Sequence, residues 1–393
     1  MSISFIRFFL SHLLSSRSRQ KIVLLALFGL LLSSFSLLFL QGIMGGLQEN
    51  MIQRSKDIHG DFLLRLDQDL SQSERKQLVQ ELSDYAEFVT QELEVELLVR
   101  HRNYLSPVLL RGLLLNDDQI PAFLKGYDLS GLILGSDLAR KIRAYQLAEV
   151  VMYSPAAVNE MLGDVPRVSS DEVSDLFHSG QIEVDGIQAW TRIEFVQNLL
   201  AETKVNSIRL YQATLNVSQL NNIVKRQGLV SKVKLYSWAD LFPELMWAFQ
   251  LENIVMILLF TSMCLLISLS IVSGFSLFFN KIKFDLATLW FLGCSRKKLN
   301  VLCLSTIQVL NLIVCSMGVA LALLILKLLK YFNPTVMPDV FMERSLPVSY
   351  SWWELLLSLG LPYMIATIFS ILSYRQFFQE NKSFLPLIRR LGQ

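Results

Sequence analysis

The chain has 393 residues, of which 36 are basic and 34 acidic, so its net charge of +2 says little about partners. Apolar residues make up 52% and charged residues only 18%, against about 25% charged residues in a typical soluble domain. This composition excludes a disordered chain and indicates that part of the protein lies in lipid. Four cysteines also exclude a disulfide-dense secreted scaffold.

Four stretches lack any charged residue over a length that can cross a bilayer, which takes about 20 apolar residues. They are Ile22–Leu40, Asn253–Asn280, Leu299–Leu326 and Leu355–Tyr374. Each predicts a helix, because lipid offers no other way to satisfy the backbone of a single segment. The first run is too long for a cleaved signal peptide and no small-residue cleavage site follows it, so we expect a membrane anchor.

Basic residues concentrate in the short segments outside these spans. Residues 1–21, 281–298 and 375–393 hold 13 basic and 2 acidic residues, whereas the insert 46–249 holds 20 basic and 28 acidic residues. The positive-inside rule places the three basic segments in the cytoplasm. We therefore expect a multi-pass membrane protein with both termini cytoplasmic.

The expected fold is an α-helical membrane protein with four transmembrane helices in a 1 + 3 arrangement and a large α+β extracytoplasmic domain between helices 1 and 2. No cysteine lies in that domain, so its own core must hold it together. The expected segments are a cytoplasmic N-terminus (1–21), spans at 22–44, 250–280, 299–328 and 354–374, a periplasmic domain (45–249), a cytoplasmic coupling helix (281–298), a periplasmic loop (329–353) and a cytoplasmic tail (375–393).

Local patterns in the external segment predict a mixture of strands and helices. The expected strands are Asp61–Asp67, Glu92–Arg100, Gly131–Leu134, Ile182–Trp190, Ser207–Gln212 and Lys232–Tyr236. The expected helices are Ser71–Phe88, which opens with a capping box, and Ser136–Ile142, Thr191–Leu200 and Val217–Arg226.

Helical character is expected to continue beyond two of the spans, from the first to about Lys56 and from the second back to about Leu241. Glycines interrupt the first extension at positions 42, 45 and 46. They either permit close packing against another span or act as a hinge.

No catalytic pattern stands out. The chain has no Walker P-loop, no G-x-S-x-G, no H-E-x-x-H and no Cys/His metal spacing. The four histidines are scattered, and the acidic cluster Glu92, Glu94 and Glu96 is expected to be a solvated strand face. We expect no cofactor, no metal site and no nucleic-acid partner.

Apolar residues recur at helical spacing in 281–298, and Gly293 offers a helix stop. A short amphipathic helix is expected here, which either lies on the membrane or docks into a cytoplasmic partner.

Five motifs carry a resemblance to a known family: ILGSDLA at 133–139, EVDG at 183–186, LEN at 251–253, KIKFDLATLWFLGCSR at 281–296 and LPV at 346–348. In order and spacing they resemble the lipoprotein-releasing (LolC/LolE) permeases, which belong with the macrolide exporters and cell-division permeases. The resemblance covers nearly the whole chain and does not favour either paralogue. The segment after the last span departs from the family's pattern.

The resemblance implies a permease subunit of a MacB-like, type VII ABC transporter. Such a complex lies in the bacterial inner membrane, extracts lipoproteins from it and passes them to a periplasmic carrier by mechanotransmission. The implied partners are a cytoplasmic ATPase dimer, a second homologous or identical permease, the carrier, the lipoproteins and membrane lipid. The chain itself is not expected to be an enzyme. The open alternative is a cell-division-type permease that signals to cell-wall hydrolases and transports nothing.

Three sets of site residues follow from the resemblance. The ATPase-coupling residues would be Asp285, Leu286, Leu289, Trp290 and Gly293. A lipid or substrate cavity would be lined by Leu37, Leu40, Ile43, Met44, Met256, Leu259 and Phe260. The turn-rich stretch Pro155–Gly180 is expected to be an exposed hairpin or loop, and it is either an ordinary surface loop or the site that meets the carrier through Val165, Pro166 and Arg167.

Overall fold

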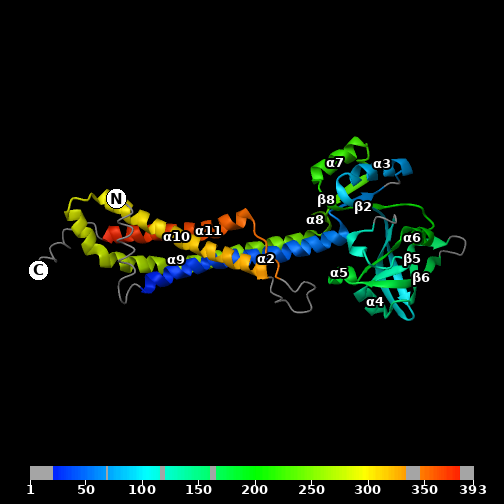
Figure 1. Ribbon diagram of the computed structural model, residues 1–393, viewed down its shortest axis with the longest axis horizontal. Coiled ribbons are helices and arrows are strands. Elements are labelled where there is room, and N and C mark those ends of the chain that lie inside the picture. The colour runs from blue at the N-terminus through cyan, green and yellow to red at the C-terminus, as the bar shows by residue number, and fades with distance from the viewer. Residues whose placement is uncertain (1–20, 68–69, 116–119, 160–164, 333–345, 381–393) are drawn as a thin grey trace. The chain divides into compact units, whose positions relative to one another are not determined.

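The computed structural model describes residues 21–67, 70–115, 120–159, 165–332 and 346–380. The chain divides into two compact units (Figure 1). The helical unit comprises Met1–Asn50 and Trp247–Gln393, and the domain unit comprises Met51–Met246.

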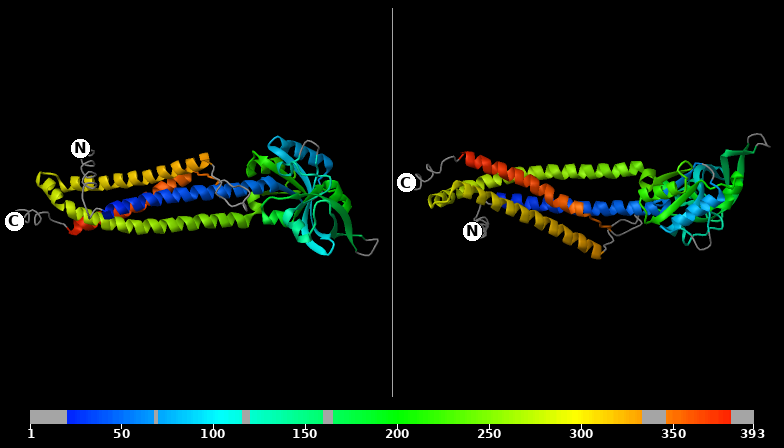
Figure 2. Two further views of the ribbon diagram at one scale, coloured as in Figure 1. Left: turned by 60° about the horizontal axis from the view of Figure 1, so that its bottom comes forward. Right: turned by 90° about the horizontal axis from the view of Figure 1, so that it is seen from above.

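Four long helices form the described part of the helical unit: α2 (Lys21–His59), α9 (Pro243–Phe291), α10 (Arg296–Phe332) and α11 (Trp352–Glu380). Each contains a stretch that is long and apolar enough to cross a membrane, as the sequence predicted. Within the unit α2 contacts both α9 and α10 (Figure 2). Ser33 Oγ lies 2.9 Å from Cys264 Sγ, and Ser34 Oγ donates a hydrogen bond to the Cys315 carbonyl at 3.2 Å.

Glycines of α2 let neighbouring segments approach closely. A Cβ on Gly42 would lie 2.8 Å from Leu326 of α10, and a Cβ on Gly46 would lie 2.3 Å from the carbonyl oxygen of Pro347. The Gly42 carbonyl also accepts a hydrogen bond from the Ser349 amide at 3.0 Å. Of the two roles that the sequence left open for these glycines, the structure supports close packing.

One end of α9 differs from the expectation, whereas the other lies two residues from the expected position. The segment 281–298 is not a separate helix, because α9 continues through Phe291. No glycine or proline occurs from Phe275 to Leu292, and Gly293, with a φ of 95°, lies beyond the helix end. At its other end α9 begins at Pro243, and Trp238–Leu241 forms a separate helix, α8. Proline has no N–H and suits a first helical turn, so it separates the two helices.

The domain unit is built on one sheet, in which nine strands are described (Figures 1 and 2). The order β3-β7-β4-β6-β5-β2 closes into a small barrel because β2 also pairs with β3, while β8, β1 and β9 extend the sheet beyond β2. The strands are β1 (Phe62–Leu66), β2 (Ala86–His101), β3 (Tyr104–Leu113), β4 (Leu132–Gly135), β5 (Glu149–Asn159), β6 (Val165–Phe177), β7 (Gln188–Arg192), β8 (Ser207–Ala213) and β9 (Val233–Ser237).

Short helices cover the sheet and complete the core. They are α3 (Gln72–Ser83), the 3-10 turn η1 (Ala122–Leu124), α4 (Ser136–Ile142), α5 (Ile182–Asp185), α6 (Ile193–Leu200) and α7 (Val217–Arg226). Alternate residues of the barrel strands, such as Val99, Val108 and Met152, are buried in one cluster with Ile142 of α4 and Val196 of α6. The expected α+β class is confirmed, but the sequence did not predict that the sheet closes.

Most of the expected external elements are confirmed, including α7 at the predicted residues and the capping box of α3. The stretch expected as one strand over 182–190 instead forms α5 followed by β7. The Asp185 carboxylate accepts hydrogen bonds from the amides of Ser179 and Gly180, which holds the chain in a tight turn there.

The stretch Pro155–Gly180, for which the sequence left a hairpin or a loop open, contains most of a β-hairpin. β5 and β6 run antiparallel, and their register shifts between Ser154 and Val158. Residues 160–164, which connect the two strands in the sequence, lie outside the described residues. Neither β3, β5 nor β6 was expected as a strand.

Candidate functional site at the end of helix α2

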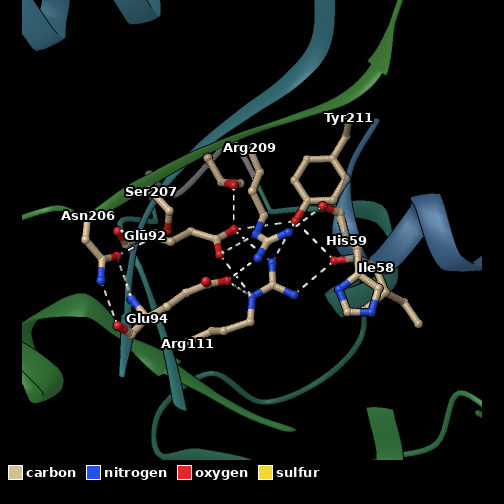
Figure 3. A network of polar contacts seen from close by, with 10 residues as sticks. Ile58, His59, Glu92, Glu94, Arg111, Asn206, Ser207, Arg209 and Tyr211 are labelled. Atoms are coloured by element: carbon tan, nitrogen blue, oxygen red, sulfur yellow. Dashed lines mark hydrogen bonds and ion pairs between the residues drawn. The ribbon is translucent and has the colours of Figure 1, made fainter. Parts of the chain in front are cut away.

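A group of buried charged side chains lies where α2 ends, beside strands β2, β3 and β8 (Figure 3). Glu92 and Glu94 come from β2, Arg111 from β3 and Arg209 from β8. The strand register places Glu94 opposite Arg111 and Thr90 opposite Arg209. Because residues two apart on a strand share a face, both acids meet both arginines on one side of the sheet.

Glu92 is the centre of this ion network. Its Oε2 atom accepts hydrogen bonds from Arg111 Nε at 2.9 Å and from Arg209 Nε at 3.1 Å. Its Oε1 atom accepts from Arg111 Nη2 at 3.0 Å and from Thr90 Oγ1 at 2.7 Å. Arg209 also pairs with Glu94. Two carboxylates therefore balance two guanidinium groups, which a buried set of charges requires.

The same two arginines bind the carboxyl-terminal end of α2. Arg111 Nη1 donates to the Ile58 carbonyl at 3.0 Å, and Arg209 Nη1 donates to the His59 carbonyl at 2.6 Å. The last carbonyls of a helix lack intrahelical donors and carry partial negative charge. Gly60 then leaves the helix with a φ of 79°, which glycine adopts without strain. Charge-assisted hydrogen bonds thus fix the helix end to the sheet.

Glu92 and Tyr211 each keep one protonation state at neutral pH. Burial alone raises the pKa of the Glu92 carboxyl, but the charges of Arg111 and Arg209 outweigh it and hold that pKa at about 2. Burial also raises the pKa of the Tyr211 hydroxyl, beside Glu92, to about 12. A general acid or base needs a pKa near the working pH. These groups are therefore suited to anchoring a helix rather than to transferring protons.

Aromatic residues hold the last turns of α2 from a second side. Trp238 Nε1 donates to Ser55 Oγ at 2.9 Å, and the Trp238 amide donates to the Asp61 carbonyl at 2.9 Å. The Phe242 ring lies edge-on to His59, with 4.9 Å between ring centroids. The end of α2 is therefore attached both to the sheet and to α8.

A serine, a histidine and an aspartate also meet in the domain, where the motifs at 133–139 and 183–186 come together. Ser136 Oγ lies 3.0 Å from His178 Nδ1, and Asp185 Oδ2 lies 3.2 Å from the same nitrogen. A hydrolytic triad needs the serine and the acid on opposite ring nitrogens. This trio therefore cannot relay a proton. Within the described residues, no group of three or more His, Cys, Asp or Glu side chains is arranged to hold a metal ion.

The predicted ATPase-coupling residues fall at the end of α9. Asp285, Leu286, Leu289 and Trp290 lie in its last turns, and Gly293 follows the helix end in an exposed turn. They are continuous with the α9 segment that is long enough to span a membrane. Their proposed contact with an ATPase stays a prediction.

The predicted lipid-cavity residues have different surroundings within the helical unit. Leu37 is fully buried, and Ile43 packs against the cluster around Leu38. Leu40 and Leu259 are exposed, whereas the rest are half-buried: Met44, Met256 and Phe260. The seven residues therefore do not share one environment, and their role in binding lipid stays a prediction.

The predicted carrier-binding residues begin β6. Val165 pairs with Asn159, and Pro166 pairs with Val158 across the hairpin. Pro166 is exposed and Arg167 is half-buried. The hairpin stem presents this part of the chain on regular backbone, while binding of a carrier stays a prediction.

The expectation that Glu92, Glu94 and Glu96 form a solvated face is wrong for two of the three. Glu92 is fully buried and the Glu94 side chain is 7% exposed, whereas Glu96 is exposed. The arginines that pair with them were not singled out in the sequence. One signal was present, because three acids on one strand face repel each other unless cations oppose them.

Comparisons with known proteins identify no family for this chain, but they do identify a similar solved domain. No protein-family model matches the sequence, and no curated protein matches it. Among solved structures, the chain is similar to the crystal structure of the extracellular domain of the noncanonic ABC-type transporter YknZ from Gram-positive bacteria. The match has 11% identity and a TM-score of 0.28, and it covers 45% of this chain and 98% of that domain. At this score the likeness supports no functional argument.

Proposed function

We propose that this protein is the membrane permease subunit of an ABC complex that lifts lipoproteins from the inner membrane and delivers them to a periplasmic carrier. A separate ATPase dimer would supply the energy, and the chain itself would catalyse no reaction. The proposal is supported by the four membrane-length helices, by the large domain between the first and second of them in the sequence, and by the order of the sequence motifs.

The attachment of α2 is the observation that carries the mechanism. α2 is one helix of 39 residues, which at 1.5 Å per residue is about 58 Å long. Its first part contains the apolar span, and its last carbonyls are bound by Arg111 and Arg209. A stiff helix transmits a tilt, whereas a Gly/Ser linker absorbs it. We therefore assign α2 the transmission of movement from the membrane to the domain.

Inserting four residues after Gln48 tests this transmission. A Gly-Gly-Ser-Gly insertion should leave ATP hydrolysis running in the reconstituted complex and stop the release of lipoprotein. The matched control is Ala-Ala-Gln-Ala at the same place, which adds the same length but keeps the helix and turns it by only about 40°. We expect this control to retain release. Release at the native rate with the flexible insertion would show that the domain is only tethered.

A substitution in 281–298 tests the partner separately. Leu289→Asp places a charge on the apolar side of this segment, and burying that charge unpaired in an interface would cost several kcal/mol. The variant should insert normally but lose its ATPase on purification. Normal co-purification together with full release would contradict the coupling role.

A further inference from the structure

One rim of the barrel contains an unusual set of backbone conformations. Arg102, Arg143 and Leu147 have φ values of 51°, 53° and 68°, and they account for three of the five non-glycine residues with positive φ in the described chain. Arg102 opens the two-residue turn between β2 and β3, Arg143 caps the end of α4, and Leu147 precedes β5. Glycine is the residue that suits such positions.

These three connections lie side by side. The His101 Nδ1 atom is 3.2 Å from the Ile142 carbonyl oxygen, and the Arg143 guanidinium lies 4.6 Å from the centre of the Tyr104 ring. Leu147 donates its amide to the Val173 carbonyl at 2.7 Å. We call Arg102, Tyr104, Arg143, Tyr145, Leu147, Glu149 and Glu172 the rim surface.

Apart from the contact between Arg143 and Tyr104, these side chains contribute little to the fold. Leu147 is 74% exposed and Tyr145 is 72% exposed, and both arginines are exposed as well. These residues therefore adopt an unfavourable backbone conformation although their side chains bury little surface within the chain. Strain of this kind gathers at binding sites, where it is compensated by the surrounding structure. Arginine and tyrosine are also enriched at the centre of protein interfaces.

Charges of both signs lie on the rim surface without opposite partners. Glu149 and Glu172 face each other directly across β5 and β6, which is unfavourable for like charges. Among the described residues, no cation lies within 4.0 Å of either glutamate, and no carboxylate lies within 4.0 Å of Arg102 or Arg143. The Leu147 amide donates a hydrogen bond to the carbonyl of Val173, the residue after Glu172. Leu147 also lies four residues after Arg143 in the same connection.

We infer that the rim surface binds a second, identical copy of this chain about a two-fold axis close to Leu147. A two-fold interface brings the same patch of both subunits together, so the patch must complement itself. Here Arg102 and Arg143 of one copy would meet Glu149 and Glu172 of the other, and the Leu147 side chains would pack between them. The inference deepens the proposed function, because it names the second permease as the same chain.

Cysteine cross-linking tests the contact. All four native cysteines lie outside the domain unit, so Leu147→Cys introduces the single thiol of that unit. The full-length chain in nanodiscs is treated with a short, membrane-impermeant bis-maleimide. The matched control is Val230→Cys, at an exposed position in another connection of the same domain. We expect a covalent dimer from Leu147→Cys only. Equal or absent cross-linking in the two variants would overturn the inference.

Charge reversal in the Leu147→Cys background tests the pairing. Glu149→Arg with Glu172→Arg should lower cross-linking at least tenfold, and so should Arg102→Glu with Arg143→Glu. Combining all four reversals should restore it, because the two sets of charges then match again. Failure of the combination to restore cross-linking would overturn the inference.

Glycine variants separate recognition from folding. Arg102→Gly and Arg143→Gly relieve the left-handed backbone, so the thermal midpoint should stay the same or rise while cross-linking falls. A lower midpoint would show that these side chains serve the fold instead. Cross-linking is scored without ATP or lipoprotein, so the contact can fail while transport stands, and the transport proposal can fail while the contact stands.

Discussion

The two units of the chain bury polar groups in opposite ways. In the domain unit, Glu92 and Arg111 are charged and fully buried, and they neutralise each other. In the helical unit, the described polar residues that are buried carry no charge. There Asn311 Nδ2 donates to Ser370 Oγ at 3.1 Å, and Ser34 donates to a backbone carbonyl. A strand can meet both signs of charge on its neighbours, whereas a lone charge on a membrane helix finds neither water nor a ready partner.

Glycine serves two purposes in the chain. In α2 and α10, Gly42, Gly46 and Gly318 allow another segment to approach where a Cβ would collide. In the domain, Gly60 and Gly228 have positive φ values and permit turns, while Gly131 and Gly135 also allow close approach. Helices in lipid associate through close contact of small residues, while a compact barrel depends on its connections. Each contrast predicts which substitutions will be costly in which unit.

The largest effect should come from breaking the ion network. Arg111→Met leaves the buried Glu92 carboxylate with Arg209 as its remaining cation and removes the hydrogen-bond donor to the Ile58 carbonyl. We expect the domain to lose about 3–5 kcal/mol of unfolding free energy, measured by urea denaturation. The control is Arg140→Met, which removes an exposed i,i+3 pair and should cost less than about 1 kcal/mol. Similar losses in both variants would show that burial of the network does not matter.

Acid should weaken the domain through the same glutamate. The pKa of Glu92 falls from its ordinary 4.5 to about 2 on folding. Because the folded-state pKa is the lower one, this stabilisation is complete above about pH 4.5 and is lost as the pH falls to about 2. It amounts to about 3 kcal/mol. The free energy of unfolding should change less with pH across this range in Glu92→Gln than in the native chain. An unchanged profile would contradict the assignment.

A smaller effect should distinguish the helical glycines. Gly46→Ala drives a Cβ to 2.3 Å from the Pro347 oxygen, so we expect a loss of about 1–3 kcal/mol. The matched control is Gly360→Ala in α11, where no atom lies within 4 Å of the added Cβ. That change should stabilise the helix by up to about 1 kcal/mol. Thermal unfolding in nanodiscs measures both. If Gly46→Ala is harmless, the glycines act as a hinge instead.

The smallest effect should come from the surface of the domain. Ser71 accepts a hydrogen bond from the Glu74 amide, and Glu74 accepts one from the Ser71 amide. Ser71→Ala removes half of this capping box and should cost about 1 kcal/mol. Urea denaturation of the variant should show the loss without any change in the binding of partners, because this helix end lies apart from the ion network.

Local signals in the sequence were enough to predict many elements. Charge-free runs marked the four long helices, because lipid excludes charge over a fixed length. Ser71 and Glu74 marked the start of α3, and the helix expected over 217–226 is α7. These signals act between residues a few positions apart, so no neighbouring element is needed to interpret them.

The tertiary structure decided the rest, because it depends on residues that are far apart in the chain. Glu92 lies 19 positions from Arg111 and 117 positions from Arg209, so its strand pattern looked like a solvated face until the partners met it. The closure of the barrel likewise rests on β3 pairing with both β2 and β7. The glycines of α2 were ambiguous until Pro347 was found against Gly46. In each case a residue's environment was set by long-range packing, which local periodicity does not encode.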